Sequence, residues 1–456
     1  MIEHFEEFLA AYMFLTLGIT LFAGLPVAFT LGGVALGFGL LGWEFGYLQP
    51  NEFFLFVERL WQGAAQNLVL VAIPCFIFMG TMLERSLVAK DLLYILQVLM
   101  RRVPGGLALS VTVMGTIMAA TTGIIGASVV MMTMMALPTM LYQRYHTPLA
   151  TGTIAASATL GILIPPSIML VIMADLMAIS VGNLFLGAIV PGLILSCLYF
   201  VYILFIASKN PHWAPPLSDD IGPESTKELV ILLLKGFVPP VFLIIMVLGS
   251  IFGGWATPTE AGGVGAFGAI LLALFNGRLN KEALQDVCHR TALTAGMIFM
   301  IFLGATAFSY IFRALYGEDL IIEFINYLDL GSWGLLFLLM AVIFLLGFFF
   351  DWIEITLIIL PVFTPIVAAM DLGGYVEQKD ILYWFAILAA INLQTSFLTP
   401  PFGFALFYMK GVAPSSVKMK QIYAGIIPFI LLQLFGLALV ILWPQLALWL
   451  PNELLQ

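Results

Sequence analysis

The sequence predicts an all-α integral membrane protein with the inverted-repeat architecture of ion-driven transporters. Hydrophobic residues make up 62% of the chain and charged residues only 9%, and the mean hydropathy is +1.08. Too few polar side chains are therefore present to cover a soluble globule. The apolar segments are mostly about 18–25 residues long, which suits spanning helices, and they lack the alternating pattern of barrel strands. A very long apolar segment followed by one broken at a double proline occurs in each half.

Charge and motifs exclude several classes of function. The net charge of −9 argues against a nucleic-acid partner. Cys75, Cys197 and Cys288 are isolated in apolar segments, so neither a disulfide framework nor a cysteine metal site is expected. The chain lacks an HExxH or paired-aspartate motif, as an intramembrane enzyme would need, and the GxxxxGK[ST] loop of an ATP-driven pump. We therefore expect neither an enzyme nor a bound cofactor.

Apolar segments follow one another along the chain, and two of them are too long for one crossing. At 1.5 Å per residue, segments 106–142 and 332–370 would extend well beyond a ~30 Å hydrocarbon core as straight helices. Each is interrupted near its middle, so we interpret both as re-entrant hairpins. The predicted segments are 8–23, 25–42, 62–84, 106–142, 147–181, 183–207, 229–251, 256–276, 291–316, 332–370, 381–409 and 421–449. The acidic N-terminus shows no clear signal cleavage site, so the first segment is expected to remain as an anchor.

Double prolines interrupt the segments that follow the two hairpins. Proline removes a backbone donor and clashes with the preceding turn, so Pro165-Pro166 should divide segment 147–181 into two half-helices. Pro400-Pro401 should divide segment 381–409 in the same way. The freed carbonyl groups are tolerated in a membrane where they line a cavity or are satisfied by neighbouring helices, as at an ordinary kink. Paired breaks in corresponding halves indicate a transporter binding site.

The recurring order divides the chain into two membrane repeats. Residues 1–208 form the first, 209–228 a proline-rich linker, and 229–456 the second with the C-terminal helix. The first hairpin opens toward one side of the membrane and the second toward the other, as in an inverted repeat. All but three of the 17 Lys and Arg residues then fall on one face, the exceptions being Arg59, Arg313 and Lys379. This bias places the linker in the cytoplasm and both termini outside.

The hairpin tips and helix breaks of an inverted repeat can meet near the middle of the membrane. Exposed carbonyl and hydroxyl oxygens at each break, together with the adjacent tip, suit a dehydrated monovalent cation. The first candidate site consists of Gly123, Gly126, Ser128, Gly161, Ile164 and Pro166. The second consists of Asp351, Ser396, Thr399 and Pro401.

The half-helices that start after the breaks direct free N–H groups toward the same region. A helix N-terminus attracts an anion, so these ends are expected to hold the carboxylate of a substrate. The substrate-binding candidates are Ser167, Thr395, Phe402 and Gly403. Carboxylates at the second tip, Asp351 and Glu354, are functional candidates because charge inside a membrane is costly. They have three other interpretations: a water-filled vestibule, a pair with Arg313, or a pair with another subunit.

A separate helix start is predicted at Thr257. Threonine at the N-cap, Pro258 at the first helical position and Glu260 in the first turn form a strong start signal. The small residues that follow allow close helix packing.

Several stretches together resemble the large membrane subunit of tripartite ATP-independent periplasmic (TRAP) transporters. They span nearly the whole chain in the order found in that family. The stretches are Gly126-Ala127-Ser128, Leu137 to Met140, Gly161 to Ser167, Ala256 to Ala261, Leu360 to Pro365, Leu393 to Gly403, and Gly411 to Pro414.

The resemblance implies sodium-coupled uptake of an organic acid, such as a dicarboxylate, across a bacterial or archaeal cytoplasmic membrane. It also implies an elevator movement of the hairpin-bearing domain, and it makes sodium the ion at both candidate sites. The expected partners are a separate small membrane subunit, a periplasmic substrate-binding protein and membrane lipids. A stand-alone ion-coupled carboxylate carrier or antiporter remains the alternative, which co-purification of a small subunit would exclude.

Overall fold

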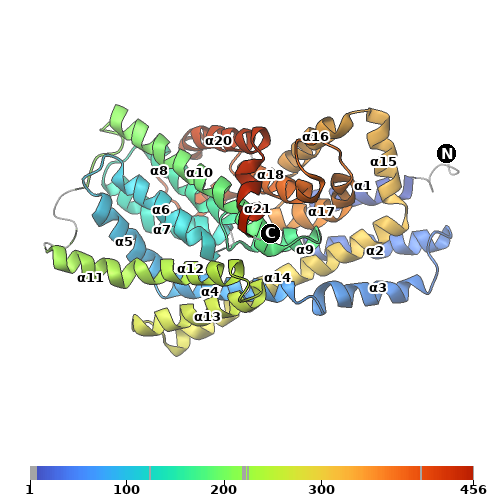
Figure 1. Cartoon of the computed structure of the whole chain (residues 1–456), viewed down its shortest axis with the longest axis horizontal. Helices are drawn as coiled ribbons and strands as arrows, with labels where there is room; N and C mark the ends of the chain where they lie inside the picture. Colours follow the sequence, from blue (N-terminus) through green and yellow to red (C-terminus); the bar gives the residue numbers. More distant parts are fainter. Residues whose placement is uncertain (1–7, 123–124, 218–221, 223–224, 401–402, 455–456) are drawn as a thin grey trace.

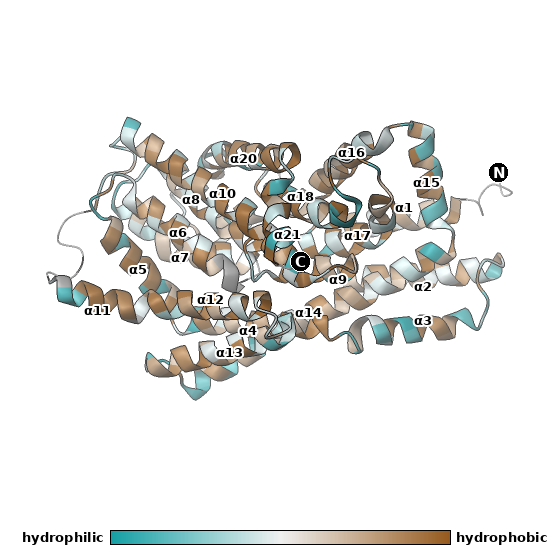
Figure 2. Ribbon diagram, viewed as in Figure 1, coloured by the Kyte–Doolittle hydropathy of each residue, from teal (hydrophilic) through white to brown (hydrophobic). Residues whose placement is uncertain are grey.

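The computed structural model describes residues 8–122, 125–217, 222, 225–400 and 403–454, and within these residues it contains helices and turns without a strand. The prediction of an all-α protein is thus confirmed. Seven described helices are long and apolar enough to cross a membrane, or up to nine if two bent pairs each count as one span. Figure 2 shows hydrophobic residues along most helices, with hydrophilic residues gathered toward ends such as the start of α11.

One set of helices, here called the framework group, forms the lower part of the view in Figure 1, except for α1, which lies higher, level with α17. Within it α4 packs against α13, α2 packs against α14, and α4 and α14 pack against each other. Its members are α1 (Leu9–Phe22), α2 (Val27–Glu44), α3 (Glu52–Leu60), α4 (Ala72–Arg85), α11 (Thr226–Gly236), α12 (Val238–Phe252), α13 (Pro258–Phe275) and α14 (Lys281–Ala314).

The second set, here called the hairpin group, lies above the framework in the same view. Here α8 packs against α7 and α20, and α18 packs against α16 and α20. Its members are α6 (Gly106–Thr122), α7 (Ile125–Tyr142), α8 (Thr147–Thr159), α9 (Ile168–Leu176), α10 (Val181–Lys209), α16 (Gly331–Leu346), α17 (Trp352–Ala368), α18 (Ile381–Ser396), α19 (Phe404–Val412), α20 (Met419–Leu442) and α21 (Gln445–Leu454).

Two amphipathic helices connect the groups. Helix α5 (Val88–Met100) packs against α6 and α11, and α15 (Gly317–Leu328) packs against α14 and α1. Each precedes a helix pair, α6–α7 or α16–α17, at the predicted position of a hairpin. The order of elements therefore recurs along the chain, as the paired segments of the sequence indicate.

Close backbone approach joins α8 to α20. A Cβ atom added to Gly152 would overlap the carbonyl group of Gly425, and one added to Gly425 would overlap the carbonyl of Pro148. Small residues at such a crossing increase van der Waals contact between apolar helices, which is a main source of helix association in a membrane. This crossing holds the first broken helix firmly within the hairpin group.

Several predicted boundaries are wrong, and each error has a local cause. Helix α14 begins at Lys281, ten residues before the predicted apolar segment, because a charged stretch extends the helix through pairs such as Arg290 with Asp286, Nε to Oδ1 3.1 Å. The predicted segment 62–84 is a bent helix that starts at Glu52 and contains a π-turn, Trp61–Ala65. The half-helix α9 ends at Leu176 rather than 181, where Ala178 adopts a positive φ of 53°.

Candidate functional site

The first break is closed by a serine cap. Helix α8 ends at Thr159, a 3-10 turn follows, and α9 begins after Ser167. The Ser167 hydroxyl donates to the carbonyl oxygen of Ile162 at 2.5 Å and accepts from the backbone N–H of Leu170 at 3.5 Å. Ser167 therefore satisfies one freed carbonyl and one helix-terminal N–H, which are groups that the broken helix leaves unpaired.

The predicted first cation site is only partly assembled. Gly161 and Pro166 are buried at the break, and Ile164 packs against Gly192 of α10, where an added Cβ would lie 2.7 Å from Ile164 Cγ1. Gly126 lies near the start of α7, and Ser128 is buried on the same helix. Gly123 lies outside the described residues. The role of this set in cation binding stays a prediction.

Three residues with hydroxyl groups lie at the end of α18 and in the turn that follows it. Thr395 donates to the Ile391 carbonyl, Ser396 to that of Leu393, and Thr399 to that of Thr395, each at 2.8 Å. Because each hydroxyl proton is used within its own helix, the oxygen lone pairs remain available to a cation. Pro401 and Phe402 lie outside the described residues, and Gly403 starts α19 with a φ of 55°.

The second hairpin contacts this hydroxyl set directly. Gly347 follows α16, and a Cβ atom added there would overlap the Ser396 side chain. The structure thus brings the predicted second tip and second break together, with Asp351 on the same turn as Gly347. The composition of the second cation site stays a prediction.

Asp351 and Glu354 form a capping box at the start of α17. Asp351 Oδ1 accepts from the Trp352 N–H at 2.8 Å, and Glu354 Oε2 accepts from the Asp351 N–H at 3.2 Å. The D-x-x-E spacing in the sequence carries this signal. The alternative pairing with Arg313 is wrong, because the Arg313 guanidinium binds Glu318 Oε1 at 2.7 Å and the Pro361 carbonyl at 2.9 Å.

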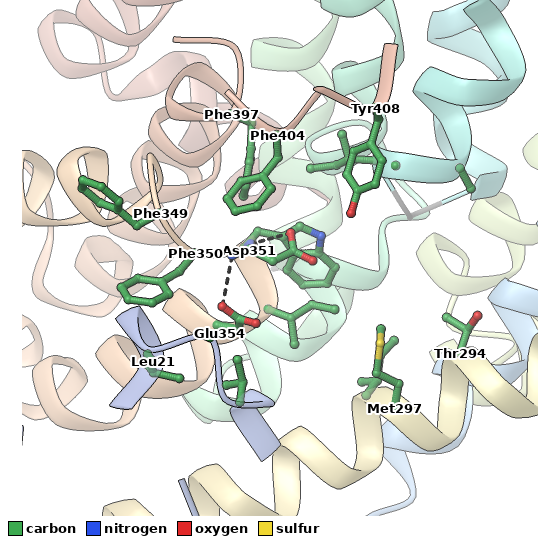
Figure 3. Close-up of a pocket in the computed structure, with 18 of the residues that line it drawn as sticks. Leu21, Thr294, Met297, Phe349, Phe350, Asp351, Glu354, Phe397, Phe404 and Tyr408 are labelled. Atoms are coloured by element: carbon green, nitrogen blue, oxygen red, sulfur yellow. Dashed lines mark hydrogen bonds between the residues drawn. The ribbon is translucent and has the colours of Figure 1, made fainter. Parts of the chain in front are cut away.

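A cavity of about 600 Å³ lies where the two groups of helices meet. Figure 3 shows the Asp351 carboxylate near its centre, with Phe397 and Phe404 on one side, Tyr408 beside them, and Met297 and Thr294 on the framework helix α14 below. The start of α7 closes another wall, since a Cβ added to Gly126 would lie 3.0 Å from the Tyr408 ring. Both repeats therefore contribute to one central cavity.

Sequence reasoning missed most of this lining. Thr294, Met297, Phe397 and Tyr408 stand in ordinary apolar segments, and only the tertiary packing brings them to the cavity. Of the predicted residues, Gly126, Asp351 and Glu354 line the cavity, whereas Ser167 and Thr395 are fully buried and are not part of its lining.

A second cavity of about 640 Å³ lies between α14, the α3–α4 bend, α9 and α17. It contains Arg59 and Arg313, two of the basic residues that the sequence places on the outer face. On its wall the Asn67 amide donates to both oxygens of Asp175, at 2.7 and 2.9 Å, and so joins the framework to α9. Arg313 therefore belongs to this cavity rather than to the central one.

Paired helix breaks and a helical hairpin around a central cavity, within a bundle of apolar helices, define a membrane transporter. A family profile described as "Tripartite ATP-independent periplasmic transporter, DctM component" matches residues 14–446. The chain therefore belongs to this family, and it is a transporter permease subunit rather than an enzyme.

Named relatives extend over almost the whole chain. The sialic acid TRAP transporter large permease protein SiaM of Vibrio cholerae is 27% identical, covering 95% of this chain and 96% of its own. The C4-dicarboxylate TRAP transporter large permease protein DctM of Pseudomonas aeruginosa is 29% identical, covering 86% and 88%. The ectoine/5-hydroxyectoine TRAP transporter large permease protein UehC of Ruegeria pomeroyi is 28% identical, covering 97% and 99%.

A solved structure shares the fold. The YdaH transporter of Alcanivorax borkumensis superimposes with a TM-score of 0.60 over 87% of each chain, at 13% sequence identity. This likeness concerns the architecture alone.

Proposed function

We propose that this chain couples the inward flow of sodium ions to the uptake of an organic acid. The observation that carries the proposal is the charge of the central cavity. Among the described lining residues the charged ones are Asp351 and Glu354, and both are acidic. An anionic cargo would be repelled there unless a cation entered with it, because buried like charges interact strongly.

Sodium is the cation that the nearby ligands favour. The oxygens of Ser396 and Thr399 have no proton to offer, since their protons are donated to helix carbonyls, and Asp351 adds a carboxylate on the adjacent hairpin. Hard oxygen ligands of this kind suit a small dehydrated cation. A cation bound there would then provide the positive charge that the cargo carboxylate needs.

The class of cargo follows from the relatives and the cavity together. Relatives are named for sialic acid and C4-dicarboxylates, which are organic acids, and the family description includes the words tripartite and periplasmic. We therefore propose that a periplasmic binding protein delivers the acid, that a separate small membrane subunit completes the permease, and that the assembly resides in the cytoplasmic membrane with both termini of this chain outside.

Sodium coupling is tested at the second break. Thr399→Ala and Ser396→Ala remove oxygen ligands, so each should raise the sodium concentration for half-maximal uptake about tenfold, the effect of losing ~1.4 kcal/mol. The measurement is uptake of the acid, at saturating concentration, by vesicles containing the permease and its partner subunits.

Thr364→Ala is the matched control for this test. Its hydroxyl also donates to a carbonyl four residues earlier, that of Leu360, but it lies away from the helix break. Uptake by this variant should keep the normal sodium dependence. If uptake by the unmodified permease continued without any ion gradient and depended on ATP, the proposal would be contradicted.

We also propose that the hairpin group moves against the framework group during transport. The support is the way the groups meet: a large cavity lies between parts of them, and the Asn67–Asp175 bond crosses from one to the other. Cysteines at both positions, joined by a short bismaleimide in a background without native cysteines, should abolish uptake.

A second asparagine–aspartate pair is the control for cross-linking. Asn452 donates to Asp380 at 3.0 Å, and both residues belong to the hairpin group. Joining cysteines at these positions should leave uptake largely intact, since no movement between them is required. Full uptake after cross-linking of positions 67 and 175 would rule out the elevator movement.

A further inference from the structure

Two prolines inside α17 leave backbone carbonyl groups without helical donors. In an α-helix each N–H donates to the carbonyl four residues earlier, and proline has no N–H. Pro365 therefore gives no hydrogen bond to the carbonyl of Pro361, and Pro361 gives none to that of Leu357. Both Leu357 and Pro361 line the second cavity. Within a membrane protein, carbonyl groups freed in this way need a donor from elsewhere.

Arg313 of α14 is such a donor for Pro361. Its Nη2 group donates to the Pro361 carbonyl at 2.9 Å, while its Nε lies 2.7 Å from Glu318 Oε1. The guanidinium group is planar and holds its N–H groups in fixed directions, so one side chain serves both partners at once. Glu318 lies in the first turn of α15, which packs against α14, and it thus orients Arg313 toward α17.

The Arg313–Pro361 bond joins the two groups of helices, since α14 belongs to the framework group and α17 to the hairpin group. The Asn67–Asp175 bond crosses the same boundary, and all four residues line the second cavity. The Arg313 side chain is 51% exposed. Water can therefore replace the carbonyl when this bond breaks, so its loss leaves no bare charge buried. A bond of this kind can form and break during transport.

We propose that Arg313 is a positioning residue for transport, which holds the second hairpin against the framework group through the carbonyl that Pro365 leaves free. The bond forms in the arrangement that the structure shows, and it breaks when the hairpin group moves. Pro365 takes part in this role, because any other residue there would pair the Pro361 carbonyl inside α17. The inference rests on the proposed function, since it assumes the movement between the two groups.

Distances between the groups measure the contribution of this bond. Glu44→Cys at the end of α2 and Glu377→Cys in the loop before α18 place spin labels on the two groups at exposed positions. Double electron–electron resonance is recorded on the full chain in lipid nanodiscs, with Cys75, Cys197 and Cys288 replaced. It gives the ratio of the present arrangement to the moved one. Arg313→Met removes the donor, so this ratio should fall about fivefold, the effect of one hydrogen bond.

Proline substitutions test whether the freed carbonyl is the partner that matters. Pro365→Ala supplies the missing N–H, so Arg313→Met in this background should change the ratio by less than about twofold. Pro361→Ala is the matched control, because it supplies an N–H to the Leu357 carbonyl but leaves the carbonyl of position 361 free. In that background Arg313→Met should keep its effect of about fivefold. The contact with Glu318 is lost in both backgrounds and cannot account for a difference.

The outcomes separate this inference from the proposed function. Two distances whose ratio is unchanged by Arg313→Met would overturn the positioning role and leave the movement intact. An equal effect of Arg313→Met in both proline backgrounds would overturn it too, since the freed carbonyl would then not be the partner. A single distance in the unmodified chain and in every variant would remove the movement and the positioning role together.

Discussion

The break between α8 and α9 is sealed inside the protein, whereas the break between α18 and α19 opens onto the central cavity. In the first, Ser167 caps the half-helix and also binds the Ile162 carbonyl, and residues on both sides are buried. In the second, Phe397 and Phe404 face the cavity, and Thr399 lies half-buried behind them. Similar proline pairs therefore have different surroundings in the two halves: one break is buried, and the other borders the cavity.

The two hairpins also differ in the residues that they contribute to the central cavity. The first contributes small and apolar residues to the cavity, such as Gly126 and Ala127, which allow the aromatic ring of Tyr408 to approach closely. The second contributes the carboxylates of Asp351 and Glu354. At this cavity the first half therefore contributes close packing, and the second half contributes negative charge.

The largest expected difference between the two breaks comes from substituting the capping residue in each half. Ser167→Ala loses a helix cap and should lower the free energy of unfolding by roughly 0.5–2 kcal/mol, because the α9 terminus and the Ile162 carbonyl lose their partner. It should leave half-saturating sodium and substrate concentrations unchanged. Thermal melting of the purified chain, together with vesicle uptake, measures both effects.

Asp351→Asn is the counterpart in the second half. Asparagine caps a helix as well as aspartate does, so stability should change little. The negative charge at the cavity is lost, so the sodium concentration for half-maximal uptake should rise steeply. If Ser167→Ala instead raises the half-saturating substrate concentration without changing the melting temperature, Ser167 binds substrate as the sequence predicts, and the two breaks act alike.

Local chemistry explains what the sequence could predict. The N-cap at Thr257, with Pro258 at the first helical position and Glu260 completing a capping box, is confirmed, since Thr257 accepts from the Glu260 N–H at 3.3 Å. Helix α8 ends before Pro165 and helix α18 ends before Pro400, because proline has no N–H to donate to a helical hydrogen bond. Such signals act within a few residues, so they survive any tertiary arrangement.

Contacts between residues that lie far apart in the sequence could not be predicted from such local patterns. The cavity wall needs Met297 from α14 beside Tyr408 from α19, and neither residue differs from its apolar neighbours in sequence. The Asn67–Asp175 bond joins residues 108 positions apart. The spacing of Asp351 and Glu354 predicts a capping box, whereas the position of two carboxylates inside a membrane segment favours a role in ligand binding.

The smallest expected effect is in the linker after α10, which lies outside both helix breaks. His146 stacks on Trp213 with ring centroids 4.2 Å apart, and the backbone N–H of His146 donates to the Trp213 carbonyl at 2.8 Å. Burial, and then the nearby His212, lower the pKa of His146 below its ordinary value near 6.5. The folded contact therefore favours neutral His146, so its stabilisation is complete above that ordinary value and is lost as the pH falls toward the lowered pKa.

Hydrogen exchange measures this pH dependence. Amides of residues 210–217, corrected for intrinsic rates, should lose protection modestly between pH 7.5 and pH 5, because burial and the nearby His212 disfavour a charged His146. Removing the neighbouring charge with His212→Gln should reduce this loss, while His289→Gln, on the exposed start of α14, should not. Equal protection at both pH values would show that the backbone bonds of Trp213, Ala214 and Leu217 hold the linker whatever the charge of His146.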